Sequence, residues 1–334
     1  MTKFLDKVSA AGVHPPPPPK KKETKGKEAS AQIHRSPISF SVKWFFPDYP
    51  GFWTYGTCNI DEYHMNLQLI RVHLNRSLSQ LTAPLSAEAA YAVPKAFPPP
   101  PEQGEWRESV LYAAIVDLIS RLTARVVMLG FVVAVMHTTS ALLTNIMFDL
   151  CARPEYVELL RQEIRGVTGG SGLLDAKTQL HQLKLMDSFM KESQRLAGGN
   201  YFINNRGLED DVVLSDGSVL PKASIVATPA IVKGFYEDEG TFDGHRFVRL
   251  AEKTGSPGQW SFVNTSTEQL GFGLGAHACP GRFFASNQLK IALVHLLLKY
   301  DWKLPIGGQR PAAVQVGHES IPDREATVFY KIHS

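Results

Sequence analysis

The sequence predicts a mainly helical protein with a small β portion in its C-terminal half. Within residues 60–95, apolar side chains recur at helical spacing, at Leu67, Ile70, Leu74 and Leu78. The β-prone runs are short, and they cluster around one Ser-Asp-Gly turn. The chain has 334 residues, of which 44% are hydrophobic and 20% are charged. This composition supplies enough apolar surface for a sizeable core.

Further helices are expected in the first half of the chain. The proline run Pro98–Pro101 separates the first helix from a second one over about 105–129. A long, mostly buried helix is expected from Arg125 to Leu150. Pro154 suits the first turn of the next helix, and a glycine-rich break at residues 169–172 ends it.

The second half of the chain adds two helices and the strands. One helix is expected from about Leu183 to Leu196. Short strands are expected at Val212–Leu214 and Ser224–Ala227, with the turn between them at residues 215–217. The last strong helix follows Cys279. Its buried stripe comprises Phe284, Leu289, Leu293, Leu296 and Leu297.

Residues 1–40 differ in composition from the rest of the chain. Five prolines, Pro15–Pro19, precede three lysines and a Gly/Lys/Glu/Ser stretch. Such a segment favours extended, solvated conformations, so we expect a disordered tail followed by a single domain over 41–334. Contact of this basic segment with anionic lipid is the alternative. The net charge of +3 is too small to indicate a nucleic-acid partner.

The three cysteines are widely separated, which argues against a disulfide framework and against a CxxC metal knuckle. Cys58 and Cys151 are expected to be small buried hydrophobic residues. The N-terminus shows neither a secretory signal nor a bilayer span, and the apolar run Val126–Met136 is short for a span. A buried helix suits that run better. Cys279 is different because of its neighbours.

The segment from Phe272 to Arg282 places three glycines around Cys279. These glycines allow positive φ angles and a close approach of the backbone to a flat ligand. A loop that leads into a helix N-terminus would hold a thiolate and lower its pKa. His277 could reach a carboxylate at the rim of the same ligand. The alternative is a structural loop in which the cysteine is incidental.

The pattern Phe272-x-x-Gly275-x-x-x-Cys279-x-Gly281 resembles the heme-binding signature of the cytochrome P450 superfamily. The resemblance implies heme b as the cofactor, with Cys279 as the axial ligand of its iron. It also implies that His277, which replaces an arginine common in the superfamily, pairs with a heme propionate. A histidine at this position resembles the variant common in filamentous fungi.

Two more segments resemble motifs of the same superfamily. Glu192 and Arg195 lie three residues apart on an expected helix, where they share one face and can pair. Arg246 matches the arginine that completes a Glu-Arg-Arg cluster in the superfamily. The resemblance gives this cluster a structural role, which is to hold the loop that carries Cys279.

His137 and Thr138 match the oxygen-activating turn of the superfamily's long central helix. Thr138 falls at the position of the proton-relaying threonine, and His137 stands where an acid is usual. A histidine can still carry a proton near neutral pH. The alternative is that the threonines bond back to i−4 carbonyls in a buried helix. Arg206 matches a position that contacts a heme propionate, although a solvated loop arginine is the alternative.

The sequence departs from the superfamily pattern in two places. The N-terminal anchor region is replaced by the Pro/Lys tail, and the helices usual between positions 130 and 131, including lid helices over substrate, are not found. An open distal face would weaken the exclusion of water from the reaction. Members of the superfamily usually lie on the cytosolic face of the endoplasmic reticulum, but no anchor is seen here, so the location stays open.

The resemblance implies a heme-thiolate monooxygenase of fungal secondary metabolism. Such an enzyme oxidises a hydrophobic small molecule with O2 and with electrons from NADPH-cytochrome P450 reductase, and we expect a monomer. Two alternatives stay open at this point. One is a shortened, non-catalytic relative or heme-binding remnant. The other is a heme-thiolate enzyme that uses peroxide without a reductase.

Overall fold

The computed structural model describes residues 74–333 except 103, 125–128, 175, 198, 200, 209, 231–233, 276–277 and 318, without the side chains of 129–136 and 204–206. The tail, Cys58 and His277 therefore lie outside the described residues. The chain divides into two compact units. The smaller includes Phe202–Ala230 and Thr265–Pro280, and the larger comprises Val72–Tyr201, Ile231–Asn264 and Gly281–Ser334.

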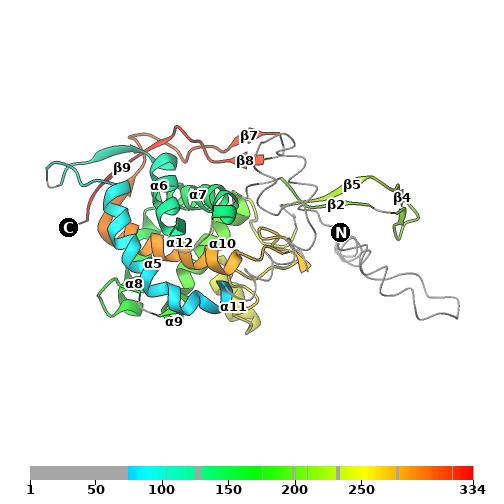
Figure 1. Ribbon diagram of the computed structural model, residues 1–334, viewed down its shortest axis with the longest axis horizontal. Coiled ribbons are helices and arrows are strands. Elements are labelled where there is room, and N and C mark those ends of the chain that lie inside the picture. Colours follow the sequence, from blue (N-terminus) through cyan, green and yellow to red (C-terminus); the bar gives the residue numbers. More distant parts are fainter. Residues whose placement is uncertain are drawn as a thin grey trace. The chain divides into compact units, whose positions relative to one another are not determined.

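The larger unit is a helical body whose elements are labelled in Figure 1. Its helices are α5 (Asn75–Ala96), α6 (Leu111–Ala124), α7 (Leu129–Ala152), α8 (Glu155–Thr168), α9 (Lys177–Gln182), α10 (Lys184–Leu196), α11 (Arg246–Thr254) and α12 (Arg282–Lys299). α12, orange in the figure, packs against α5, α7, α8 and α9. The prediction of a mainly helical fold is confirmed.

The apolar stripes that predicted these helices lie mostly in the core where the structure describes them, although Leu74 is half-buried and Leu67 and Ile70 lie outside the described residues. Leu78 of α5 is buried, and so are all five of the stripe residues expected in α12. In α7, residues 143–150 are buried throughout. α8 ends at Gly169, whose φ of 59° lies in the left-handed region that glycine favours. The short helices α9 and α11 were not predicted.

The prediction of one helix over about 105–129 is wrong at its start. Arg107–Val110 forms strand β1, and α6 begins only at Leu111. β1 pairs antiparallel with β9 (Thr327–Ile332), which also pairs with β6 (Tyr300–Lys303). The hydrogen-bonding partner of β1 lies more than 200 residues later in the chain, so local periodicity could not indicate this sheet.

The inner face of this sheet packs around Phe97, which directly follows α5. The rings of Trp302 and Tyr330 meet the Phe97 ring edge-on at centroid distances of 5.0 and 5.5 Å. The Tyr300 hydroxyl donates to the Phe97 carbonyl at 2.6 Å, and burial raises the pKa of Tyr300 to about 12. These contacts attach the sheet to the end of α5. The larger unit also contains the hairpin of β7 (Val314–Val316) and β8 (Glu319–Ile321).

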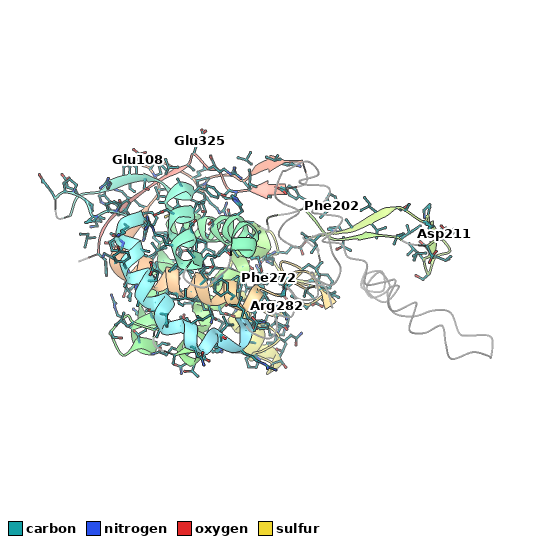
Figure 2. All side chains as sticks on the ribbon, in the orientation of Figure 1. Glu108, Phe202, Asp211, Phe272, Arg282 and Glu325 are labelled. Atoms are coloured by element: carbon teal, nitrogen blue, oxygen red, sulfur yellow. The ribbon has the colours of Figure 1, made fainter. Side chains whose placement is uncertain are left out.

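The smaller unit contains a two-part β ribbon and the Cys279 loop. β2 (Phe202–Gly207) pairs with β5 (Ile225–Pro229), and β3 (Val212–Val213) pairs with β4 (Val219–Leu220). Figure 2 shows Phe202 and Asp211 at opposite ends of this ribbon. A turn is present at residues 215–217 as predicted, with Gly217 at a φ of 87°. It joins β3 to β4, which was not predicted, whereas the strand expected at Ser224–Ala227 overlaps β5 and pairs with β2. Among the described residues, no helix is both long and apolar enough to cross a membrane.

Candidate functional site

The Cys279 loop, Leu270–Pro280, is closed by hydrogen bonds between its own backbone groups. The Cys279 N–H donates to the carbonyl of Phe272, labelled in Figure 2, at 2.7 Å. The Gly273 N–H donates to the Leu270 carbonyl, also at 2.7 Å, which makes a tight turn at the start of the loop. Together these bonds position Cys279 opposite Phe272, and the cysteine is only partly buried.

The three glycines near Cys279 differ in backbone conformation. Gly273 and Gly275 adopt φ angles of 74° and 69°, a region in which a side chain is strained. Gly281 has a φ of −84° and precedes the first residue of α12, so its backbone conformation does not demand glycine. The positive φ angles before Cys279 fit the expectation that the loop backbone approaches a flat ligand closely.

The residues around the loop fit an iron that takes one ligand from the protein and its other ligands from a porphyrin. Within the described residues, no group of three or more His, Cys, Asp or Glu side chains could hold a metal ion. A single thiolate can still bind iron when a porphyrin supplies the other donors. The second described cysteine, Cys151, is a poor candidate because burial raises the pKa of its thiol to about 12.

His137 and Thr138 lie on α7, and both side chains are exposed. The two residues that follow, Thr139 and Ser140, are buried. Among the described side chains of α7, the change from exposed to buried therefore falls at the turn singled out in the sequence. The described side chains that follow are buried or half-buried, as expected of a mostly buried helix. The exposure of His137 and Thr138 leaves the imidazole and the hydroxyl accessible to a ligand.

Arg206 lies in β2, opposite Val226 of β5, and an irregularity in the strand pairing falls between Ile203 and Arg206. It is therefore part of a strand and not of a loop, which the alternative reading of Arg206 had assumed. Its side chain and His277 lie outside what the structure describes. The expected propionate contacts of both residues thus remain predictions.

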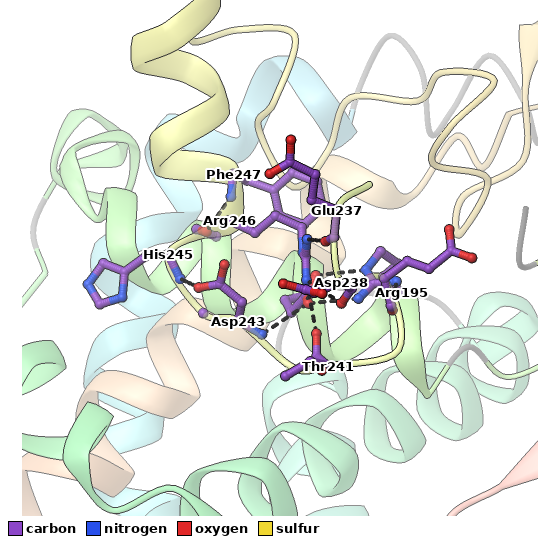
Figure 3. Close-up of polar contacts among 12 residues, drawn as sticks. Arg195, Glu237, Asp238, Thr241, Asp243, His245, Arg246 and Phe247 are labelled. Carbon is purple, nitrogen blue, oxygen red and sulfur yellow. Dashed lines mark hydrogen bonds and ion pairs between the residues drawn. The ribbon is translucent and has the colours of Figure 1, made fainter. Parts of the chain in front are cut away.

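Glu192, Arg195 and Arg246 come together in the larger unit, and Figure 3 labels the two arginines. The Glu192 side chain is fully buried, and the Arg195 guanidinium donates to both of its oxygens at 2.8 Å. Arg246, at the start of α11, donates to Glu192 Oε1 at 3.0 Å. A buried carboxylate paired with two guanidinium groups is a charge-assisted cluster with little competition from water.

The remaining guanidinium N–H groups of this cluster bond to the chain segment 237–241. Arg195 donates to the Glu239 carbonyl at 2.7 Å. Arg246 donates to the carbonyls of Glu237 and Thr241 at 2.7 and 2.9 Å. Figure 3 labels both arginines together with Glu237 and Thr241. The cluster therefore holds α10, α11 and this irregular segment together, a role that the sequence motif alone did not specify.

The family model for cytochrome P450 matches residues 117–318, which is more than half of the chain. The chain belongs to the cytochrome P450 family. The matched range contains the Cys279 loop, the His137–Thr138 turn and the Glu192 cluster.

Several curated fungal P450 proteins are similar to this chain. A cytochrome P450 monooxygenase of Nectria sp is 44% identical over 192 residues, which cover 57% of this chain and 37% of the relative. One from Botryotinia fuckeliana is 42% identical, covering 59% and 41%. An ent-kaurene oxidase of Gibberella intermedia is 38% identical, covering 62% and 40%. This P450 chain thus spans about two fifths of the length of these relatives.

The structure adds contacts of α10 that the sequence did not reveal. Lys191, beside Glu192, is buried, and its ammonium group donates to the carbonyls of Ser261 and Asn264 at 2.7 and 3.0 Å. At the other end of α10, Glu163 accepts the N–H groups of residues 185 and 186, and burial raises its pKa. A lysine inside an otherwise buried helical stripe was the one signal available for Lys191.

Proposed function

We propose that this P450 chain is a heme-thiolate monooxygenase that oxidises a hydrophobic small molecule. The observation that carries the proposal is the Cys279 loop, in which Gly273 and Gly275 have positive φ angles and the Cys279 N–H bonds to the Phe272 carbonyl. This is a short backbone arrangement that holds one partly buried cysteine. Its sequence matches the heme-binding signature of the family at each fixed position.

In this proposal Cys279 ligates the iron of heme b. Phe272, Gly275 and Gly281 shape the loop, while His277 and Arg206 pair with the heme propionates. When bound, the heme supplies the centre at which O2 is activated and one oxygen atom is inserted into the substrate. The protein supplies the thiolate, the position of the heme and the proton transfers.

His137 and Thr138 are proposed to handle protons. An imidazole near neutral pH can accept or donate a proton, and a threonine hydroxyl can pass one on through its own hydrogen bond. Both side chains are exposed on α7. Glu192, Arg195 and Arg246 are proposed to act only through the structure, because each is fully or nearly buried within its own cluster.

The proposed substrate class and the proposed electron donor are argued from the similar proteins. Those reported above are named as fungal P450 monooxygenases and as an ent-kaurene oxidase. By analogy, we propose a hydrophobic small molecule of secondary metabolism as the substrate, and NADPH-cytochrome P450 reductase as the source of electrons for a monomeric enzyme.

The test is turnover of the heme-loaded full chain with a panel of hydrophobic terpenoid and polyketide-like compounds. The proposal predicts product formation that needs both NADPH and the reductase, and that Cys279→Ala abolishes. Product formed with hydrogen peroxide alone would indicate the peroxide-using alternative. Loss of product in the parent chain under both conditions, with heme still bound, would indicate a non-catalytic heme-binding relative.

A further inference from the structure

The carboxylate of Asp149 is buried near the end of α7, eleven residues after Thr138. Its side chain is 2% exposed. The Ser193 hydroxyl donates to one carboxylate oxygen at 2.6 Å, and Arg310 Nε donates to the other at 2.6 Å. Arg153, which directly follows the last residue of α7, donates to this second oxygen at 2.9 Å. Each donor comes from a different part of the larger unit, so the carboxylate joins them.

Arg310 contacts α7 at two successive turns. Besides Asp149, it donates through a terminal nitrogen to Asn145 Oδ1 at 3.2 Å. Asn145 and Asp149 are four residues apart, so they lie on the same face of the helix. Arg310 belongs to the segment between β6 and β7, and Ser193 lies on α10 beside Glu192. α7 is therefore bound at one face to α10 and to the C-terminal part of the chain.

These contacts determine the position of α7 along its own axis, which apolar packing leaves open. Burial of residues 143–150 decides which face of α7 points inward, but the hydrophobic effect is non-directional and determines position along the helix axis only weakly. A shift by one residue moves a helix by about 1.5 Å and rotates its side chains. Charge-assisted hydrogen bonds of 2.6 Å do not tolerate such a shift.

We propose that Asp149, with Ser193 and Arg310 as its partners, is the positioning residue that sets α7 along its axis and so places the His137–Thr138 turn. At the rise of a regular helix, Thr138 lies about 16 Å from Asp149. Asp149 thus acts on the turn through the rigid helix and does not touch substrate. The inference rests on the proposed function for the role of Thr138, and not for the contacts themselves.

The first test is backbone hydrogen exchange of the heme-loaded full chain. In Asp149→Asn, exchange of the amides over 137–152 should become about tenfold faster or more, because opening of this helix costs less. Asp187→Asn is the matched control. Asp187 is a partly buried carboxylate of α10 that pairs with Lys290 and accepts the Phe262 N–H, and none of these residues lies on α7. Equal acceleration over 137–152 in both variants would overturn the proposal.

Variants of Ser193 and Arg310 test the same contacts in case the Asp149→Asn protein does not fold. Ser193→Ala should loosen the same amides, and Ser193→Thr, which keeps the hydroxyl, should restore protection. Arg310→Gln removes a side chain that is 24% exposed and should act like Asp149→Asn. Unchanged exchange in both Ser193→Ala and Arg310→Gln would contradict a positioning role for the contact.

The second test asks whether the effect reaches Thr138. With NADPH and the reductase, the fraction of consumed NADPH that appears as hydrogen peroxide should rise in Asp149→Asn. If Asp149 acts through Thr138, the double variant with Thr138→Ala should release no more peroxide than Thr138→Ala alone. Additive increases would overturn the link. A parent chain without thiolate-bound heme would contradict the proposed function, while the exchange results would still decide the role of Asp149.

Discussion

The sharpest consequence for stability concerns Glu192. Changing Glu192 to Gln removes the negative charge from a fully buried side chain but keeps its size. It leaves Arg195 and Arg246, whose side chains are only 7% and 8% exposed, without their counter-charge. Removing one partner from a buried charge cluster costs about 3–5 kcal/mol. Such a loss is a large fraction of the free energy of unfolding of a typical protein, about 5–15 kcal/mol.

Urea denaturation of the parent and of Glu192→Gln measures this difference directly. In a separate thermal melt, at about 2 °C per kcal/mol for a chain of this size, the melting temperature should fall by about 6–10 °C. Glu158→Gln is the control, because Glu158 pairs with Arg165 at 3.0 Å while both side chains are about half exposed. That pair contributes about 0–1 kcal/mol. If the two variants lost equal stability, the assignment of Glu192 as a buried anchor would be wrong.

Two further predictions concern a buried histidine and a crowded glycine. Burial lowers the pKa of His295 from 6.5 to about 4, so the unfolded chain binds this proton more readily than the folded chain does. The stability that the neutral histidine contributes is therefore fully present above pH 6.5. Up to about 3 kcal/mol of it is lost as the pH falls towards 4. Denaturation across this range should show that part of the pH dependence in the parent but not in His295→Gln; identical profiles would refute the assignment. Gly244→Ala should destabilise by about 1–3 kcal/mol, because its Cβ would lie 2.6 Å from Tyr156 Cε1 and 2.9 Å from Phe189 Cδ2. Gly240→Ala, which meets nothing within 4 Å, should be close to neutral in the same thermal melts, and a Gly244→Ala protein as stable as this control would contradict the packing.

Features of the structure that depend on local spacing could be predicted from the sequence. The longer helices of the larger unit, but not α9 and α11, follow from apolar periodicity, and the pairing of Glu192 with Arg195 follows from their separation by three residues. The Cys279 loop was predicted because glycine at two of its positions signalled backbone conformations that the structure contains, at Gly273 and Gly275.

Contacts between distant parts of the chain could not be predicted in this way. β1 looks like the start of α6 until its partner β9 is known, and nothing near Arg107–Val110 indicates that partner. Asp149 resembles an ordinary acid near the end of an apolar helix, and only the fold brings Ser193 and Arg310 to it. Arg310 itself lies in a segment without periodicity, so no sequence pattern singles it out.

The proposed function depends most directly on Cys279 as the ligand of a heme iron. The decisive measurement is the absorption spectrum of the purified, heme-loaded full chain after reduction under carbon monoxide. We predict the red-shifted Soret band of thiolate-ligated heme in the parent and in Cys151→Ser, and its loss in Cys279→Ala. Absence of the band in the parent, or its persistence in Cys279→Ala, would contradict the assignment.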